Sequence, residues 1–171
     1  MPETAQQYTQ RLLSYSAGKQ PLNVQRATPK RLVALTRRMD KKKMTRRPQP
    51  DKWSVAEILA HLADAELVIG WRLRSILGAS GNLVQAYDQD VWADIFQYKR
   101  RDPKASIETF RVLRESNLAL LKTVPKNLWE NYGMHQERGK ESIAHLVKMI
   151  AGHDLNHLQQ LEKIVKEKRA K

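Results

Sequence analysis

The chain has 171 residues, 41% of them hydrophobic, and a formal net charge of +13 at pH 7. This length suits one domain with a sizeable core, and the composition does not fit a disordered chain. The sequence contains no cysteine, which excludes disulfides, thiolate metal ligands and a nucleophilic thiol on the protein itself.

The N-terminal residues are expected to form a helical extension ahead of the main domain. The chain start is polar and lacks the apolar core of a signal peptide. No apolar run in the sequence approaches the roughly 18 residues that a membrane span needs, so we expect a soluble, cytoplasmic protein with no membrane partner. Thr4 to Ser16 has helix-forming composition. We assign residues 1–27 to this extension and residues 28–171 to the domain.

The next segment is strongly basic and is expected to begin a helix at Thr28-Pro29, where a capping residue precedes a proline in the first helical position. The strip from Arg26 to Lys52 carries much of the net charge, and the tail from Lys163 to Lys171 adds more. A basic surface can attract nucleic acid or another polyanion. No recognised nucleic-acid motif accompanies the charge, so a solvated exterior is the simpler interpretation.

A long helix is predicted to open at Trp53-Ser54, because Ser54 and Glu57 have the spacing of a capping box. An apolar stripe continues along it until the glycines at 78–81. On a wheel with Val55 at zero and about 100° per residue, His61 falls near ~240°, on the shoulder of the stripe. Two carboxylates share this helix: Glu66 falls near ~20°, within the stripe, and Asp64 near ~180°.

The second half of the chain is also predicted to be helical. It contains a short aromatic helix around Trp92 to Tyr98, a helix from Asp102-Pro103, one turn at Pro125 to Trp129, a loop from Asn131 to Gly139 and a final helix from about Glu141 to Lys168. We find no convincing β-strand. The predicted fold is therefore all-α, a four-helix bundle with a short inserted helix and the N-terminal helical extension. Such bundles can build metal sites from side chains on facing helices.

Two histidines on the final helix have the spacing of a metal-binding pair. His153 and His157 lie four residues apart, so their side chains project from one side of consecutive turns. With Ile143 at zero they fall near ~280° and ~320°, beside or within the apolar stripe, whereas His145 falls near ~200° and is expected to be solvated. A pair at this spacing is by itself a weak signal, and one packed and one exposed histidine would give the same pattern.

A third imidazole, from His61, would complete a site for Zn²⁺, Ni²⁺ or Fe²⁺ that leaves positions open for water or substrate. Asp64, Glu66 or Asp154 could orient a ligand histidine through its other ring nitrogen. The alternative for each of them is a surface charge or an ion pair with an arginine. The helix also resembles the H-E-x-x-H helix of zinc proteases, but the aspartate is shorter and the usual third-ligand patterns are absent.

The pattern Trp53-Ser54-x-x-Glu57-x-x-x-His61, followed by His153-x-x-x-His157-x-x-Gln160, resembles the DinB/YfiT-like superfamily. The similarity covers roughly Thr28 to Lys166. It implies a four-helix bundle with a divalent metal, nickel or zinc and alternatively iron or manganese. His61, His153 and His157 match the three ligands of the family, and Glu57, Asp64 and Asp154 are the residues expected to support them.

The resemblance further implies a metal-dependent transferase or isomerase that uses a small thiol as cosubstrate, or a metal-assisted hydrolase. It also implies a homodimer. The residues expected around the pocket are Trp53, Glu66, Arg72 and His135, although an arginine can be a surface charge and a loop histidine is usually exposed. The alternatives are a protein that binds nucleic acid or polyanions through its basic strip, and a dimeric scaffold with a structural metal.

Overall fold

The computed structural model describes residues 3–167, so the expected end of the last helix at Lys168 and the end of the basic tail lie outside the described residues. The helices are α1 (Ala5–Ser16), α2 (Pro21–Thr36), α3 (Lys41–Thr45), α4 (Val55–Gly78), α5 (Gln89–Ile95), α6 (Pro103–Thr123) and α7 (Ile143–Glu167). Short 3₁₀ helices follow α5 (Tyr98–Arg100) and α6 (Lys126–Glu130). The strands are β1 (Leu83–Val84), β2 (Tyr132–His135) and β3 (Gly139–Ser142).

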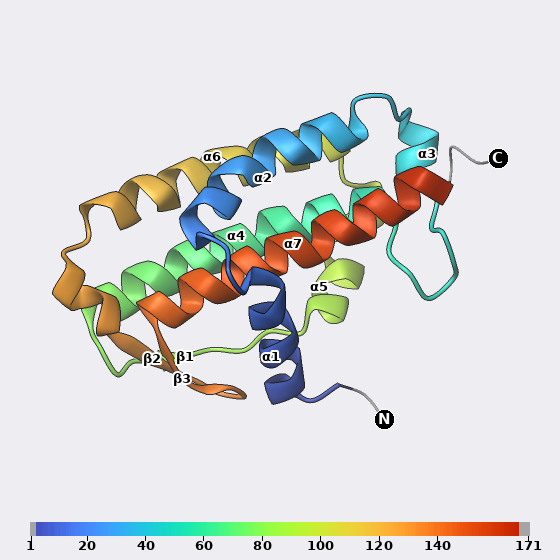
Figure 1. Ribbon diagram of the computed structural model, residues 1–171. Helices are drawn as coiled ribbons and strands as arrows, with labels where there is room; N and C mark the ends of the chain where they lie inside the picture. The colour runs from blue at the N-terminus through green and yellow to red at the C-terminus, as the bar shows by residue number, and fades with distance from the viewer. Residues whose placement is uncertain (1–2, 168–171) are drawn as a thin grey trace.

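The long helices α2, α4, α6 and α7 form a four-helix bundle, and α1 lies across the side of α7 (Figure 1). This architecture confirms the predicted bundle with its short inserted helix, α5. Two groups of buried apolar side chains fill it, one around Leu32, Ile58, Leu59 and Leu158 and the other around Leu73, Ile76, Leu146 and Ile150. Among residues 3–167, no helix combines the length and apolarity needed to cross a membrane.

Local capping signals set most of the helix starts. The Ser54–Glu57 capping box opens α4, Thr4 caps α1 in the same way through Gln7, and Asp102 caps α6 ahead of its proline. Each of these starts agrees with the sequence-based prediction.

The predicted helix start at Thr28-Pro29 is wrong, because α2 begins at Pro21 and runs through both residues. Pro29 has no backbone N–H and so leaves the carbonyl of Gln25 without its helical donor. The Nη1 atom of Arg114 donates to that carbonyl at 3.2 Å instead. Residues 27 and 28, between which the sequence placed the end of the N-terminal extension, lie inside this continuous helix.

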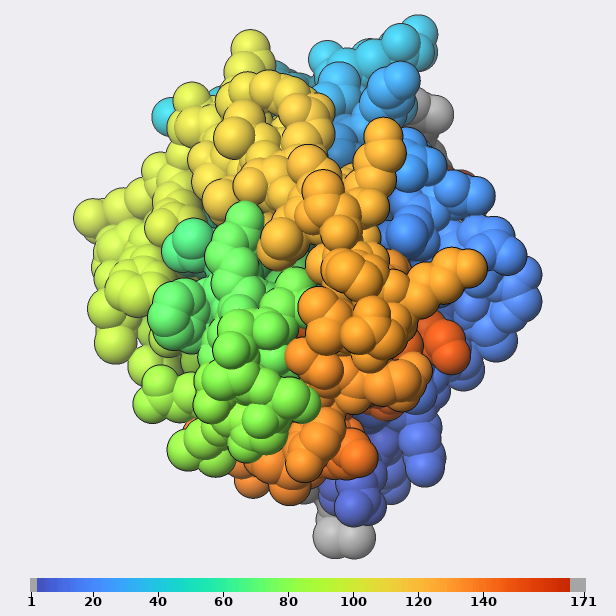
Figure 2. Space-filling model, turned by 90° about the vertical axis from the view of Figure 1, so that its left-hand side faces the viewer, coloured from blue at the N-terminus to red at the C-terminus, as the bar shows by residue number. Residues whose placement is uncertain are grey.

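The prediction of no β-strand is also wrong, since residues 132–142 form a hairpin rather than a loop. Strands β2 and β3 pair antiparallel, and β1 pairs parallel to β2. The strands are too short to show a period-two pattern in the sequence. Gly139 has a φ of 76° where the hairpin turns back, a conformation that glycine adopts readily. The sheet lies beside the bundle near the end of α4 and the start of α7, at the end of the molecule that faces the viewer in Figure 2.

Helix α1 is fixed to the bundle by a close approach between Gly152 of α7 and Leu12. A Cβ atom on Gly152 would lie 1.9 Å from the carbonyl oxygen of Leu12, which is a backbone atom and cannot rotate away. We therefore expect Gly152→Ala to push α1 from α7 and to lower the free energy of unfolding by about 1–3 kcal/mol, the usual effect of overpacking. Urea unfolding would measure this. Gly78→Ala is the matched control, because a Cβ atom there meets nothing within 4 Å.

Candidate metal centre

Three imidazoles from two helices converge between α4 and α7. The Nε2 atom of His153 lies 3.1 Å from Nε2 of His61 and 3.1 Å from Nε2 of His157. One ligand atom from each ring falls within 4.8 Å of the others. His61 and His157 are buried and His153 is partly buried. The sequence-based prediction that these three side chains meet is therefore confirmed in its geometry.

This arrangement fits a metal ion better than it fits hydrogen bonds among the rings. A neutral imidazole offers one acceptor nitrogen and one donor nitrogen, so Nε2 of His153 cannot bond well to both neighbours at once. Tetrahedral coordination at a Zn–N distance of about 2.0–2.1 Å places neighbouring nitrogens about 3.3 Å apart. The spacing of 3.1 Å is close to that value. One cation would satisfy all three lone pairs.

The protonation of the rings also suits metal binding. Burial lowers the pKa of His61 and His153 well below the usual range and that of His157 to about 4, so the rings are neutral at pH 7 with a lone pair available. Nδ1 of His157 lies 2.9 Å from Oε1 of Gln160. Because the amide oxygen only accepts, Nδ1 carries the proton and Nε2 is left free to bind a metal.

Trp53 lies against His61, with 5.1 Å between the ring centroids. It also lines a cavity of about 540 Å³ that His157 and Gln160 border. The interpretation of Trp53 as a pocket residue is consistent with this position. The Nδ1 atom of His61 is buried without a hydrogen-bond partner in the described structure. The Trp53 ring packs against the imidazole, whose Nε2 atom faces His153.

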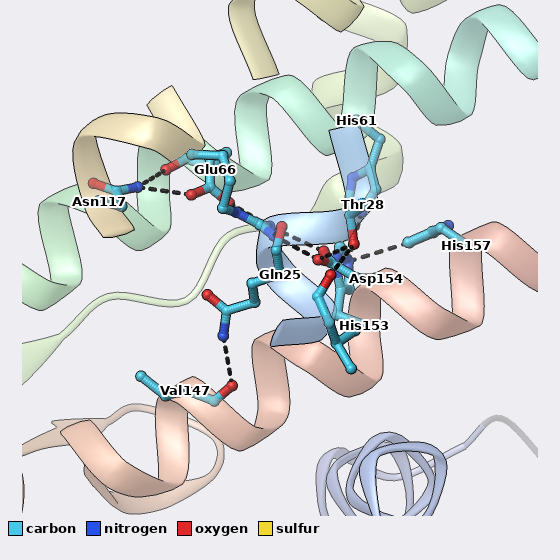
Figure 3. A network of polar contacts seen from close by, with 11 residues as sticks. Gln25, Thr28, His61, Glu66, Asn117, Val147, His153, Asp154 and His157 are labelled. Atoms are coloured by element: carbon cyan, nitrogen blue, oxygen red, sulfur yellow. Dashed lines mark hydrogen bonds and ion pairs between the residues drawn. The ribbon is translucent and has the colours of Figure 1, made fainter. Parts of the chain in front are cut away.

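The carboxylates predicted to orient the histidines are instead paired with arginine. Asp154 accepts hydrogen bonds from Thr28 at 2.8 Å and from Arg114 at 2.5 Å, and Glu66 accepts from Arg114 at 2.7 Å. Asn117 donates to Glu66 as well, at 2.8 Å. Figure 3 shows this network beside the three histidines, with contributions from α2, α4, α6 and α7. It fixes how α7 faces α4, and thereby the direction of the histidines, without touching their rings.

Glu57 and Asp64 are likewise bound elsewhere. Glu57 caps α4 and accepts from Nη2 of Arg47 at 2.6 Å, and Asp64 accepts from Nη1 of Arg101 at 2.7 Å. These side chains hold the segments before α4 and after α5 against the bundle. Asp64 thus shows the ion-pair alternative that the sequence left open, and Glu57 shows the capping role predicted from its spacing with Ser54.

The bonds of Glu57 predict a pH dependence of stability. Burial raises the pKa of Glu57, but hydrogen bonds from Arg47 and Ser54 outweigh it, so that the folded value lies below the ordinary 4.5. A lowered folded pKa contributes stability above the unfolded value, and this contribution is lost as the pH falls through the folded pKa. We expect Glu57→Gln to weaken the fall of the unfolding free energy below about pH 4.5, measured by urea unfolding across pH. An unchanged pH profile would contradict this.

A second cavity, of about 480 Å³, opens beside His61 and His153. Arg72, Arg138, Tyr87 and Tyr8 line it together with apolar side chains of α4 and α7. The interpretation of Arg72 as a pocket residue fits this position. His135 is 3% exposed at the end of β2, so the expectation of an exposed loop histidine is wrong, and it reaches the site through Arg72 rather than at a pocket mouth.

Sequence reasoning missed two contributors to the site. Arg114, which is 1% exposed, holds both buried carboxylates, but its position on α6 gives no local signal, since it looks like any other arginine of a charged helix. Tyr8 borders both cavities from the N-terminal helix. Nothing local in the sequence indicated that α1 folds back over the histidines.

Comparison with known proteins supports these observations. The family model described as the DinB superfamily matches residues 26–161. The chain is 25% identical over 68% of its length to a protein of Oceanobacillus iheyensis (67% of that protein), and 23% identical over 78% to one of Halalkalibacterium halodurans (78% of that protein). Both relatives are provisionally named metal-dependent hydrolases. The fold is also similar to the solved structure of YfiT from Bacillus subtilis, which is described as a probable metal-dependent hydrolase with an unusual four-helix bundle topology. The two structures align with a TM-score of 0.81 and 18% sequence identity, over 86% of this chain and 85% of YfiT.

Proposed function

The chain belongs to the DinB superfamily, and from that premise we propose that it is a metal-dependent hydrolase that acts on a small molecule at His61, His153 and His157. The observation that carries the proposal is the convergence of three neutral imidazole nitrogens beside an open cavity of about 480 Å³. A volume of this size suits a small-molecule substrate. The names of the two bacterial relatives support the reaction class.

The proposed roles of the residues follow from their contacts. His61, His153 and His157 would hold the cation, which supplies Lewis acidity and a nucleophile at neutral pH. Gln160 fixes the tautomer of His157 through Nδ1, and Trp53 limits the movement of the His61 ring. His61 and His153 both line the cavity, so a cation held by the three rings would lie next to the space that a substrate would enter.

Metal analysis of the protein tests the proposal directly. Protein purified without a metal-chelating tag should contain about one divalent ion per chain, with zinc and nickel the first candidates for an all-imidazole donor set and iron and manganese less favoured. Removal of the ion by a chelator should abolish hydrolysis of test esters and amides, and readdition should restore it. A chain that takes up no metal would refute the proposal.

A second candidate is transfer of a substrate group to a low-molecular-weight thiol. The observation that favours it is the pairing of the nearby carboxylates with arginine, since Asp154 and Glu66 already bind Arg114 and are poorly placed to accept a proton from water. A thiol has a pKa of about 8.5 and needs less help to ionise than water does. Because the chain has no cysteine, the thiol would have to be a cosubstrate.

Product analysis separates the two reactions. In water enriched in oxygen-18, hydrolysis incorporates the label into the product and proceeds without added thiol. Thiol transfer requires the thiol and yields a thioether or thioester of the expected mass. The same metal-loaded protein serves for both measurements, with the chelated protein as control.

A further inference from the structure

The buried arginine of the cavity has no anionic partner in the described structure. Arg72 is 7% exposed and lines the cavity beside His61 and His153. Its guanidinium donates to the carbonyl of Gln85 at 2.7 Å and lies 5.9 Å from the Tyr87 ring centroid, but it forms no ion pair within residues 3–167. Arg138, the other arginine of the cavity wall, is already paired with Glu141 at 2.6 Å. Glu137 and Glu141 attract the guanidinium electrostatically but do not form an ion pair with it. A buried charge that no carboxylate contacts is costly, so its presence here needs an explanation.

His135, which lies next to Arg72, has hydrogen-bond donors facing both of its ring nitrogens. Nε2 of His135 lies 3.3 Å from Nη2 of Arg72, while Nδ1 faces the backbone N–H groups of Glu137 and Arg138 at 3.2 and 3.4 Å. Burial, reinforced by Arg138, lowers the pKa of His135 to about 4, so the ring is neutral at pH 7. A neutral ring accepts at one nitrogen alone. Whichever tautomer is present, a donor on one side meets another donor.

The cavity between Arg72 and the histidines is lined by apolar side chains. On α4, Ala65, Val68 and Ile69 line the wall between His61 and Arg72, and on α7, Leu146 and Ile150 line it beyond His153. His61 and Arg72 lie 11 residues apart, which is close to a whole number of turns and about 16 Å along the helix axis. Along α4 the lining thus changes from imidazole to apolar to cationic. Other segments add polar side chains to the cavity border, among them the carboxylates of Glu3 and Glu137.

We propose that this cavity binds an elongated substrate whose carboxylate or phosphate group pairs with Arg72 while its reactive group faces the three histidines. The anion would supply both the counter-charge that Arg72 lacks and the acceptor that the contact between Arg72 and His135 lacks. A planar guanidinium suits either oxyanion, because it can donate two parallel hydrogen bonds. This assignment rests on the proposed function insofar as the cavity is the substrate site.

Anion binding to the full-length, metal-free protein tests the assignment. Calorimetric titration with inorganic phosphate and with succinate should show binding at one site per chain for at least one of them, and the tighter ligand identifies the oxyanion class. Arg72→Gln should weaken this binding about tenfold or more, since hydrogen bonds to a charged group are lost. Arg100→Gln is the control for net charge, because Arg100 is exposed and lies outside this cavity, and it should change binding less than about twofold.

The stability of the same variants gives an independent readout. If Arg72 is kept for binding, removal of its unpaired charge should leave the thermal midpoint of the ligand-free protein unchanged or raise it. Equal binding by wild type and Arg72→Gln, or absence of one-site binding, would overturn the assignment. A large fall in the midpoint would also overturn it, by showing that Arg72 is structural. Arg72→Lys keeps the charge but not the planar fork and should bind more weakly than wild type.

The result of the anion-binding test can be distinguished from the result of the test for metal-dependent hydrolysis. Anion binding through Arg72 in a protein that takes up no metal would refute the metal-dependent hydrolase and leave the anion site standing. Metal-dependent hydrolysis in a protein that binds neither anion would support the proposed function and refute the anion site at Arg72.

Discussion

Replacing His153 by alanine is expected to lower the affinity for a divalent metal by more than about 100-fold and to abolish the metal-dependent activity. Loss of a residue that merely supports a ligand already costs about 10- to 100-fold in affinity or activity, and His153 is the ring whose Nε2 lies 3.1 Å from both other ligand atoms. Because its side chain is partly buried at a cavity wall, its removal should leave the fold in place. Elemental analysis and competition with a chelating dye would measure the change.

His145→Ala is the matched control for this prediction. His145 lies on the same helix, outside the cluster of three histidines, and its backbone N–H bonds to Ser142. Its replacement should leave metal content and activity near the wild-type values. Full metal binding by His153→Ala would contradict the site, and a circular dichroism spectrum that differs from wild type would show that the fold rather than the ligand had been lost.

Replacing Arg114 by methionine is expected to lower the free energy of unfolding by about 3–5 kcal/mol, the usual cost of breaking a buried ion pair by removing one partner. The change would leave Asp154 and Glu66, each 1% exposed, without their cation. The carbonyl of Gln25, already without its helical donor because of Pro29, would lose its bond as well. Urea unfolding followed by circular dichroism would measure the loss.

Arg111→Met, one turn earlier on α6, is the control. Arg111 forms ion pairs with Glu108 and Glu115, but all three side chains are exposed, and such pairs contribute little to stability. Adding Glu66→Gln and Asp154→Asn to Arg114→Met should recover part of the lost stability, because neutral amides are cheaper to bury than unpaired carboxylates. A wild-type free energy of unfolding in Arg114→Met would contradict the role given to this network.

The sequence by itself determined the main helices, because their signals are local. The Ser54–Glu57 capping box, the proline after Asp102 and the apolar stripe of α7 each depend on residues a few positions apart. The spacing of His153 and His157 is local in the same sense, since four residues on a helix always bring two side chains to one face. The helical wheel also placed His61 on the shoulder of the apolar stripe of α4. The family resemblance then supported its pairing with His153 and His157, which lie on another helix and which no local pattern connects to it.

Tertiary structure alone decided what the buried carboxylates outside the helix caps contact. Asp154 and Glu66 fall on the buried faces of their helices, but whether they meet a histidine or an arginine depends on α6, which the wheels of α4 and α7 do not include. The sequence also could not show that α2 continues through Pro29. The missing N–H of Pro29 is replaced, as donor to the carbonyl of Gln25, by Arg114, which is far away in the sequence. The hairpin of β2 and β3 and the unpaired Arg72 depend equally on long-range packing, because hydrogen-bond partners and desolvation are properties of the assembled core.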